Sequence, residues 1–103
     1  MGKYLFAYTG GKVPESEAEQ QAQMAAWMGW FEKLGGATVD AGNPFAGSTK
    51  VSAGGVANGG SCQLTGYSIV SAGDLNAASD LAKSCPILAN GGNVEVYETL
   101  DVM

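Results

Sequence analysis

One long helical pattern, residues 15–34 (ESEAEQQAQMAAWMGWFEKL), constrains the fold of this chain more than any other stretch. Large apolar side chains recur in it at steps of three and four, so they share one face of a helix. These side chains are Met24, Trp27, Met28, Phe31 and Leu34. So broad an apolar face must be covered, and strand-like segments flank the helix on both sides. We therefore expect a β-sheet to cover it.

The two tryptophans of this helix are expected to differ in role. Trp27 lies within the apolar face, and we expect it to pack in the core, as large aromatic side chains usually do. Trp30 lies at the edge of that face, beside Trp27 and Leu34. We expect Trp30 to contact a partner subunit or the rim of a pocket.

The remaining sequence consists of extended segments and a second helix. We expect this helix from about residue 75 to 84, with Asp74 as its N-cap and Pro86 ending it. The glycine-rich stretch 53–60 predicts a hairpin turn and loop. Strands are expected at 3–9, 37–41, 48–52, 66–72 and 94–100, which are bounded by glycine, asparagine or proline.

This order of elements predicts a single α+β domain over residues 1–103, with a ferredoxin-like βαββαβ pattern and an extra hairpin. Both helices are expected on one face of an antiparallel sheet. The strands carry more large side chains than two short helices can cover, namely Tyr4, Phe6, Tyr8, Tyr67, Ile69 and Tyr97. A second copy is expected to cover the other face, which predicts a homodimer.

Composition excludes several classes of function. Ten acidic and five basic residues give a net charge of −5, which disfavours binding to nucleic acid and to anionic membranes. The apolar run near the amino terminus is too short for a membrane span and has no signal-peptide pattern, so we expect a cytoplasmic protein. Cys62 and Cys85 form no recognisable pair, and Cys85 is expected to pack as a small apolar residue at a helix end.

Three stretches carry a resemblance to a known family: the helix segment AWMGWFEKLGG, the strand GYSIV with the capped helix and SCP that follow it, and the closing GGNVEVYE. With these motifs the chain resembles, end to end, the YCII-related domain family, whose broader group includes the DGPF-type proteins. The resemblance implies a dimeric α+β barrel, in which two sheets close face to face around an internal cleft.

The sequence also departs from the family pattern. Some members carry a His–Asp pair proposed as catalytic, with the histidine on the first helix; the family's spacing puts Met24 at that position, and this chain has no histidine. The DGPF tetrapeptide is absent, and Asn58-Gly59-Gly60-Ser61 stands in about its place. The acid–base chemistry of that pair therefore cannot be carried over.

Without histidine, carboxylates and tyrosines are the candidate acids and bases. Asp40 ends a predicted strand beside Asn43, so Asp40 is the candidate general base and Asn43 the group that would orient a carbonyl. Alternatively, Asp40 pairs with Lys50 on the adjoining strand or caps a turn. Glu95 shares a strand face with Tyr97, and it is buried if that face lines the barrel or solvated if it does not.

No cofactor or metal is expected. The glycine pairs match neither a phosphate loop nor a dinucleotide-binding fingerprint, and the carboxylates are scattered rather than grouped at ligand spacing.

Two hypotheses of function follow. In the first, a homodimer binds a small, mostly apolar organic ligand in a cleft between helix and sheet, and whether it is also a cofactor-independent enzyme is left open. The residues expected to bind the ligand are Tyr4, Trp27, Trp30, Asn43, Tyr67 and Tyr97. In the second, the chain is a non-catalytic regulatory or interaction module whose aromatic face is used up by dimerisation. The resemblance to DGPF-type proteins links that module to alternative sigma factor regulation.

Overall fold

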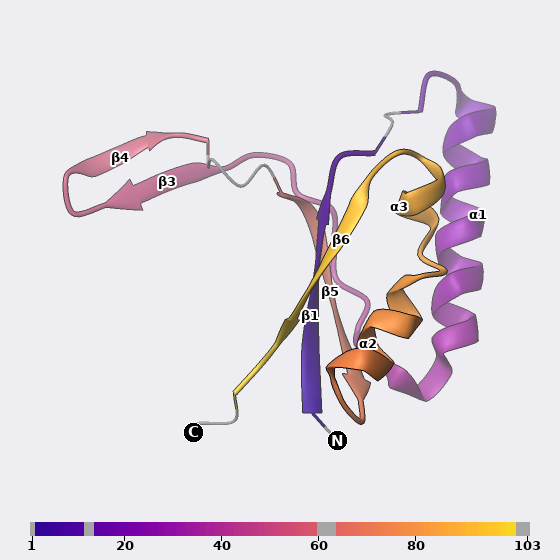
Figure 1. The fold of residues 1–103 in the computed structure, drawn as a ribbon. Coiled ribbons are helices and arrows are strands. Elements are labelled where there is room, and N and C mark those ends of the chain that lie inside the picture. The colour runs from indigo at the N-terminus through magenta and orange to yellow at the C-terminus, as the bar shows by residue number, and fades with distance from the viewer. Residues whose placement is uncertain (1, 12–13, 60–63, 101–103) are drawn as a thin grey trace.

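A four-stranded antiparallel sheet with its helices on one face forms the body of the structure (Figure 1). The computed structural model describes residues 2–11, 14–59 and 64–100. The strands lie in the order β2-β5-β1-β6, which is the ferredoxin-like order once the hairpin is set aside. They span β1 (Gly2–Thr9), β2 (Thr38–Asp40), β5 (Leu64–Ala72) and β6 (Asn93–Glu98). The helical elements are α1 (Glu17–Leu34), the short 3₁₀ turn η1 (Gly35–Ala37), α2 (Leu75–Ala82) and α3 (Pro86–Ala89). The predicted α+β fold is confirmed.

The face of the sheet that packs against the helices, here the covered face, holds the core. Phe6 of β1 lies opposite Ser68 of β5 and Val96 of β6, so these three side chains share that face. Tyr4 and Tyr8 lie on the same face by alternation, and both are buried. The aromatic residues of β1 therefore anchor the helices to the sheet.

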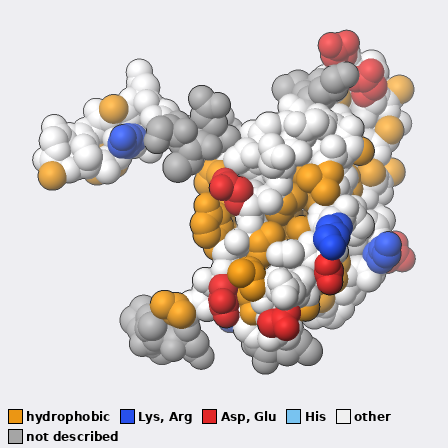
Figure 2. Space-filling model, in the orientation of Figure 1, with side chains coloured by type: hydrophobic (Ala, Val, Ile, Leu, Met, Phe, Trp, Pro, Cys, Tyr) orange, Lys and Arg blue, Asp and Glu red, His pale blue; other side chains and the backbone are white. Residues whose placement is uncertain are grey.

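The opposite face, here the open face, carries no helix in the described chain (Figure 1). Leu5 lies opposite Ile69 and Tyr97 there, and Ala7 lies opposite Tyr67. Leu5, Ile69 and Tyr67 are half-buried, whereas Tyr97 is 51% exposed. Hydrophobic side chains also reach the surface on the side from which the hairpin projects (Figure 2). One chain leaves this sheet open, so closing a barrel requires a second sheet.

The extra hairpin is a separate two-stranded sheet of β3 (Thr49–Ser52) and β4 (Gly55–Asn58) that projects from the body (Figure 1). Strand β4 lies in the stretch expected to be only turn and loop, so that prediction was wrong beyond the turn at 53–54. Lys50 is on β3, which pairs with β4 and not with β2. The adjoining-strand pairing of Lys50 with Asp40 is therefore wrong as well.

Helix α1 begins two residues later than predicted, because the Ser16 side chain caps it by accepting a hydrogen bond from the Glu19 amide. Its orientation also differs from the expectation. Trp30 is the buried residue of the helix, at 4% exposure, whereas Met24 and Met28 are 57% and 68% exposed. The other predicted members of the apolar face, Trp27, Phe31 and Leu34, are half-buried and pack against the core. The helix is thus rotated toward Trp30.

The chain after β5 forms two short helices rather than one. Asp74 caps α2 as predicted, and its Oδ1 accepts a hydrogen bond of 2.7 Å from the Ala77 amide. Pro86 ends the first pattern but also opens α3, because proline suits the first turn of a helix. Cys85 packs between them with 3% exposure, as expected, and burial raises the pKa of its thiol to about 11. Cys62 lies outside the described residues.

In the described part of the chain, no helix is long and apolar enough to cross a membrane.

Candidate functional site

A cavity of about 780 Å³ lies between the middle of α1, from Gln20 to Phe31, and the end of the sheet where β1 finishes. We call it the α1 cavity. Helix α1 contributes Met24, Trp27, Met28 and Phe31, and β1 contributes Tyr8. The segment 41–45 and the first part of β5 form the opposite wall. Its volume is within the usual range for small-molecule sites.

The wall at 41–45 can approach β5 closely because of glycine. Gly42 has φ +75°, and a Cβ at this position would collide with the carbonyl oxygen of Tyr67. The segment then runs along β5, where the Phe45 amide donates to the Thr65 carbonyl at 2.9 Å. This backbone pairing fixes the wall without filling the space in front of α1.

The helix side of the cavity is aromatic. Trp27 meets Tyr8 edge to face, with ring centroids 5.1 Å apart, and its centroid is 6.0 Å from that of Phe31. Met24 and Met28 extend this apolar surface and are exposed. Exposed methionines beside a cavity give a surface that adapts to the shape of a guest.

A chain of hydrogen bonds lies against this aromatic wall. The Tyr8 hydroxyl donates to Ser68 Oγ at 2.7 Å, and Ser68 Oγ donates to the carbonyl oxygen of Ala41 at 2.7 Å. Both side chains are buried, and both residues line the cavity. Burial raises the pKa of the Tyr8 hydroxyl far above its usual value, although the hydrogen bond to Ser68 opposes the shift. Tyr8 is therefore a neutral phenol at any ordinary pH.

The described residues that line the cavity include neutral polar groups, and none of them is acidic or basic. Its polar side chains besides Tyr8 and Ser68 come from Gln20, Gln23, Asn43, Thr65 and Asn90. Within the described ranges, no group of three His, Cys, Asp or Glu side chains is placed to hold a metal ion. An apolar surface with a few neutral polar groups suits an uncharged organic molecule.

Three of the six residues expected to bind a ligand border this cavity: Trp27, Asn43 and Tyr67. The ring of Tyr67 is on the open face, where it stacks on Phe45 with centroids 5.8 Å apart. Tyr4 is buried in the core away from the cavity, and Tyr97 is on the open face. The sixth residue, Trp30, lines a different groove, described below. The structure thus separates the six, and their roles in binding stay predictions.

The two candidate carboxylates lie outside the cavity lining. Asp40 is exposed at the end of β2; its Oδ1 accepts a hydrogen bond of 2.8 Å from the Gly42 amide, and its Oδ2 accepts one of 3.4 Å from the Tyr67 hydroxyl. This is the turn-capping arrangement that stood as the alternative to catalysis. Glu95 is exposed on the open face, where it accepts a hydrogen bond of 3.4 Å from the Tyr97 hydroxyl.

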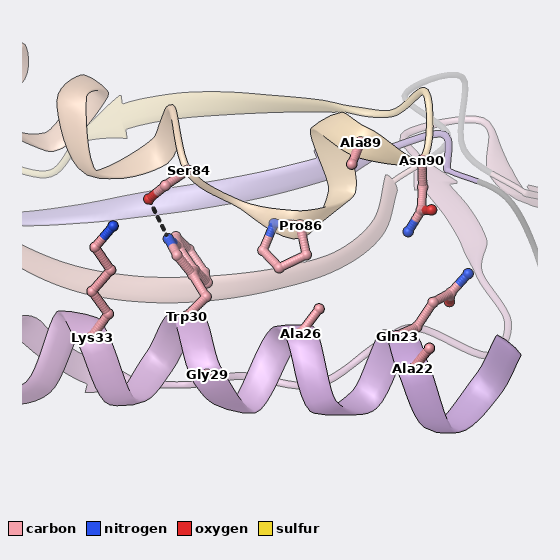
Figure 3. Close-up of a pocket in the computed structure, with 10 residues that line it drawn as sticks. All are labelled: Ala22, Gln23, Ala26, Gly29, Trp30, Lys33, Ser84, Pro86, Ala89 and Asn90. Carbon is pink, nitrogen blue, oxygen red and sulfur yellow. Dashed lines mark hydrogen bonds between the residues drawn. The ribbon is translucent and has the colours of Figure 1, made fainter. Parts of the chain in front are cut away.

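A second concavity, a groove of about 500 Å³, runs between α1 and α3 (Figure 3). Small residues of α1, such as Ala26 and Gly29, face Pro86 across it. The Trp30 indole lies in this groove and donates to Ser84 Oγ at 3.0 Å. Trp30 borders this groove but is far more buried than expected, and its contact with a partner subunit or a pocket rim stays a prediction. The groove is smaller than the α1 cavity, and the indole N–H of Trp30 already has a hydrogen-bond partner there.

Tyr8 and Ser68 were not predicted as site residues. A weak signal was present, because Ser68 is a polar residue in the middle of an apolar strand and alternation places it on the covered face. Its partner Ala41 lies 27 residues away and offers a main-chain carbonyl. Nothing in a sequence marks such an acceptor.

Comparison with known proteins identifies a family and a fold. The sequence model of the YCII-related domain matches residues 4–102. A similar solved structure is that of 5-chloro-2-hydroxyhydroquinone dehydrochlorinase from Burkholderia phenoliruptrix AC1100 in complex with 2,5-dihydroxybenzoquinone. The TM-score is 0.59 at 17% identity, covering 95% of this chain and 93% of that chain. At this identity the likeness concerns the fold alone. No curated protein matches the sequence.

Proposed function

The chain belongs to the YCII-related domain family, and we propose that it binds a small, mostly apolar organic molecule in the α1 cavity. The observation that carries the proposal is a cavity of about 780 Å³ with Trp27 and Phe31 on one wall and no charged residue among its described lining. Aromatic walls with a few fixed polar groups are typical of sites for such molecules. A similar fold in a dehydrochlorinase that was solved with a small quinone is consistent with this choice.

Asp40 is the candidate general base; it does not line the cavity itself, but Ala41, Gly42 and Asn43, which follow it, do. Both oxygens of Asp40 accept hydrogen bonds, from the Gly42 amide and the Tyr67 hydroxyl. This arrangement favours a role in holding the cavity wall over the role of a general base. Asp40→Asn keeps an oxygen for the Gly42 amide, so a retained binding affinity with a lost turnover would restore the catalytic assignment.

We further propose that the protein is a homodimer that buries the open face. That face presents Leu5, Ile69 and Tyr97, and no helix within residues 2–11, 14–59 and 64–100 packs on it. A second copy would remove this apolar surface from water, as symmetric dimers commonly do. The same open face, with the projecting hairpin, favours a second candidate function, an interaction module that needs no ligand.

Native mass spectrometry of freshly purified protein tests these proposals together. We expect the mass of a dimer plus a reproducible additional mass, which corresponds to a retained small organic molecule. A dimer that carries no additional mass, and that still takes up none when naphthalene is supplied, would favour the interaction module. A monomer would contradict the use of the open face as a dimer surface.

A further inference from the structure

The hydrogen-bond chain at the α1 cavity dictates which way each proton points. A carbonyl oxygen can only accept a hydrogen bond. In the 2.7 Å hydrogen bond between Ser68 and Ala41, the Ser68 hydroxyl is therefore the donor, and this uses its one proton. Ser68 Oγ can then only accept from Tyr8, which lies 2.7 Å away on its other side. The single proton of the Tyr8 hydroxyl is thereby committed to Ser68. Tyr8 lines the cavity, so a guest that reaches its hydroxyl oxygen meets lone pairs and no proton.

Burial makes this assignment persist. Ser68 is fully buried, so bulk water does not compete for its hydroxyl, and the Tyr8–Ser68 hydrogen bond is kept when the cavity is filled or empty. Burial also raises the pKa of Tyr8, so the phenol does not lose its proton to become a charged acceptor. The Ala41 carbonyl is fixed because the glycine beside it, Gly42, lies against the β5 backbone. The direction of the chain is therefore a property of the fold.

A guest in this apolar site forms a hydrogen bond with the Tyr8 oxygen only if the guest supplies the donor. We infer that the α1 cavity selects neutral, flat apolar molecules that carry a hydrogen-bond donor, such as a hydroxyl group on an aromatic ring, and that the Tyr8 oxygen accepts this hydrogen bond. The inference rests on the proposed function and specifies its ligand class. A guest whose hydroxyl is deprotonated is disfavoured, because it has no proton to donate to the Tyr8 oxygen and the described lining is apolar apart from neutral polar groups.

Three bicyclic probes of nearly equal shape separate the parts of this inference: naphthalene, 2-naphthol and 2-methoxynaphthalene. All three can fill an apolar cavity of this size, but only 2-naphthol donates a hydrogen bond. By titration calorimetry on the full chain, we expect 2-naphthol to bind about 3–10-fold more tightly than 2-methoxynaphthalene. We expect 2-naphthoate, an anion of similar shape, to bind at least about tenfold more weakly than naphthalene.

Two substitutions should change the preference for 2-naphthol over 2-methoxynaphthalene: one should abolish it, and the other should shift it toward 2-methoxynaphthalene. Tyr8→Phe removes the acceptor and keeps the ring, so 2-naphthol and 2-methoxynaphthalene should bind equally while the affinity for naphthalene is kept. Ser68→Ala releases the Tyr8 proton, so the methoxy oxygen gains a donor and 2-methoxynaphthalene should improve about 3–10-fold. Ser52→Ala, which removes a hydroxyl on the projecting hairpin outside the cavity lining, is the control and should leave every ratio unchanged.

The results distinguish failure of the inference from failure of the proposed function. Equal binding of 2-naphthol and 2-methoxynaphthalene to the unaltered protein would overturn the donor selection and leave the apolar site standing. A preference that survives Tyr8→Phe would also overturn it, because another group would then accept the hydrogen bond. Absence of binding by all three neutral probes would overturn the proposed function and the inference with it.

Discussion

Two tryptophans three residues apart on α1 divide the layer between helix and sheet into a filled part and an open part. Trp30 stacks on Phe6 with centroids 6.2 Å apart, and its indole nitrogen donates to Ser84. Trp27 is half-buried, touches Tyr8 and borders the α1 cavity. The connection from α2 to α3 places Ser84 and Pro86 beside Trp30, whereas Trp27 faces a glycine-containing segment that stays back from the helix.

This difference shows that the same residue type serves packing or recognition according to what stands opposite. The Trp30 ring borders a groove but is 4% exposed, so it mainly stabilises the fold and leaves little surface for a guest. A large ring with a gap in front of it keeps apolar area that a guest can cover. The predictions below test this division.

The largest expected effect is the loss of stability when the side chain of Trp30, in the filled part, is truncated. Trp30→Ala should lower the free energy of unfolding by about 3–5 kcal/mol, because it leaves a cavity where a buried indole was packed. Trp27→Ala, at a half-buried position, should lower it by about 1 kcal/mol. Urea unfolding followed by circular dichroism gives both values. A loss for Trp27→Ala as large as that for Trp30→Ala would contradict the division.

The wall of the open part is expected to depend on Gly42. Gly42→Ala should destabilise the protein by about 1–3 kcal/mol from its positive φ alone, and the added Cβ would push the segment 41–45 away from β5. Naphthalene affinity should fall with it. The control is Gly36→Ala, since the space around Gly36 is free and its φ is not positive. Unfolding curves and calorimetry measure both effects, and an unchanged affinity in Gly42→Ala would show that this segment is not a wall of the site.

Alkaline pH should weaken the filled part through Cys85. Burial raises the pKa of its thiol from 9.0 to about 11, so between these values the unfolded chain has lost a proton that the folded protein keeps. Stability is therefore full below about pH 9 and falls as the pH rises toward 11. Cys85→Ala should flatten this decline in a series of unfolding curves. An equally steep decline in the variant would assign the effect to another group, such as Tyr8.

The smallest effect is an expected gain in the groove between α1 and α3. Gly29→Ala meets no atom within 4 Å, and it replaces a helix-interior glycine, so it should stabilise the protein by about 0.5–1 kcal/mol. Because this groove is not the proposed binding site, naphthalene affinity should stay the same. Thermal unfolding and calorimetry measure the two quantities. Loss of binding in this variant would move the site from the α1 cavity to the groove.

The sequence was sufficient for the order of elements, because alternation in strands, the Asp74 cap and the long helical pattern are all local signals. It was not sufficient for the rotation of α1. Alanines and Gly29 occupy much of the helix besides the large residues, so periodicity alone ranks its faces poorly. The buried side is set by partners distant in sequence: Trp30 stacks on Phe6 of β1, and its indole N–H donates a hydrogen bond to Ser84, 54 residues away.

The candidate site was predictable only in part, for a related reason. Trp27 and Asn43 could be named from the helical pattern and the turn that Asn43 occupies, and both border the cavity. The Tyr8–Ser68–Ala41 chain could not, because it joins a strand, a second strand and a main-chain carbonyl that meet only in the folded sheet. Strand β4 was missed because glycine and alanine carry little strand preference.

The central claim is that a guest binds beside Trp27 and not beside Trp30. One titration tests it directly: naphthalene is added to ¹⁵N-labelled protein while the two indole N–H signals are followed by two-dimensional NMR. Each concavity contains one tryptophan, so the protein carries its own reporter for each. The account predicts a saturable shift that is larger for the Trp27 signal than for the Trp30 signal. A larger shift at Trp30, or no saturable shift at either indole, would contradict it.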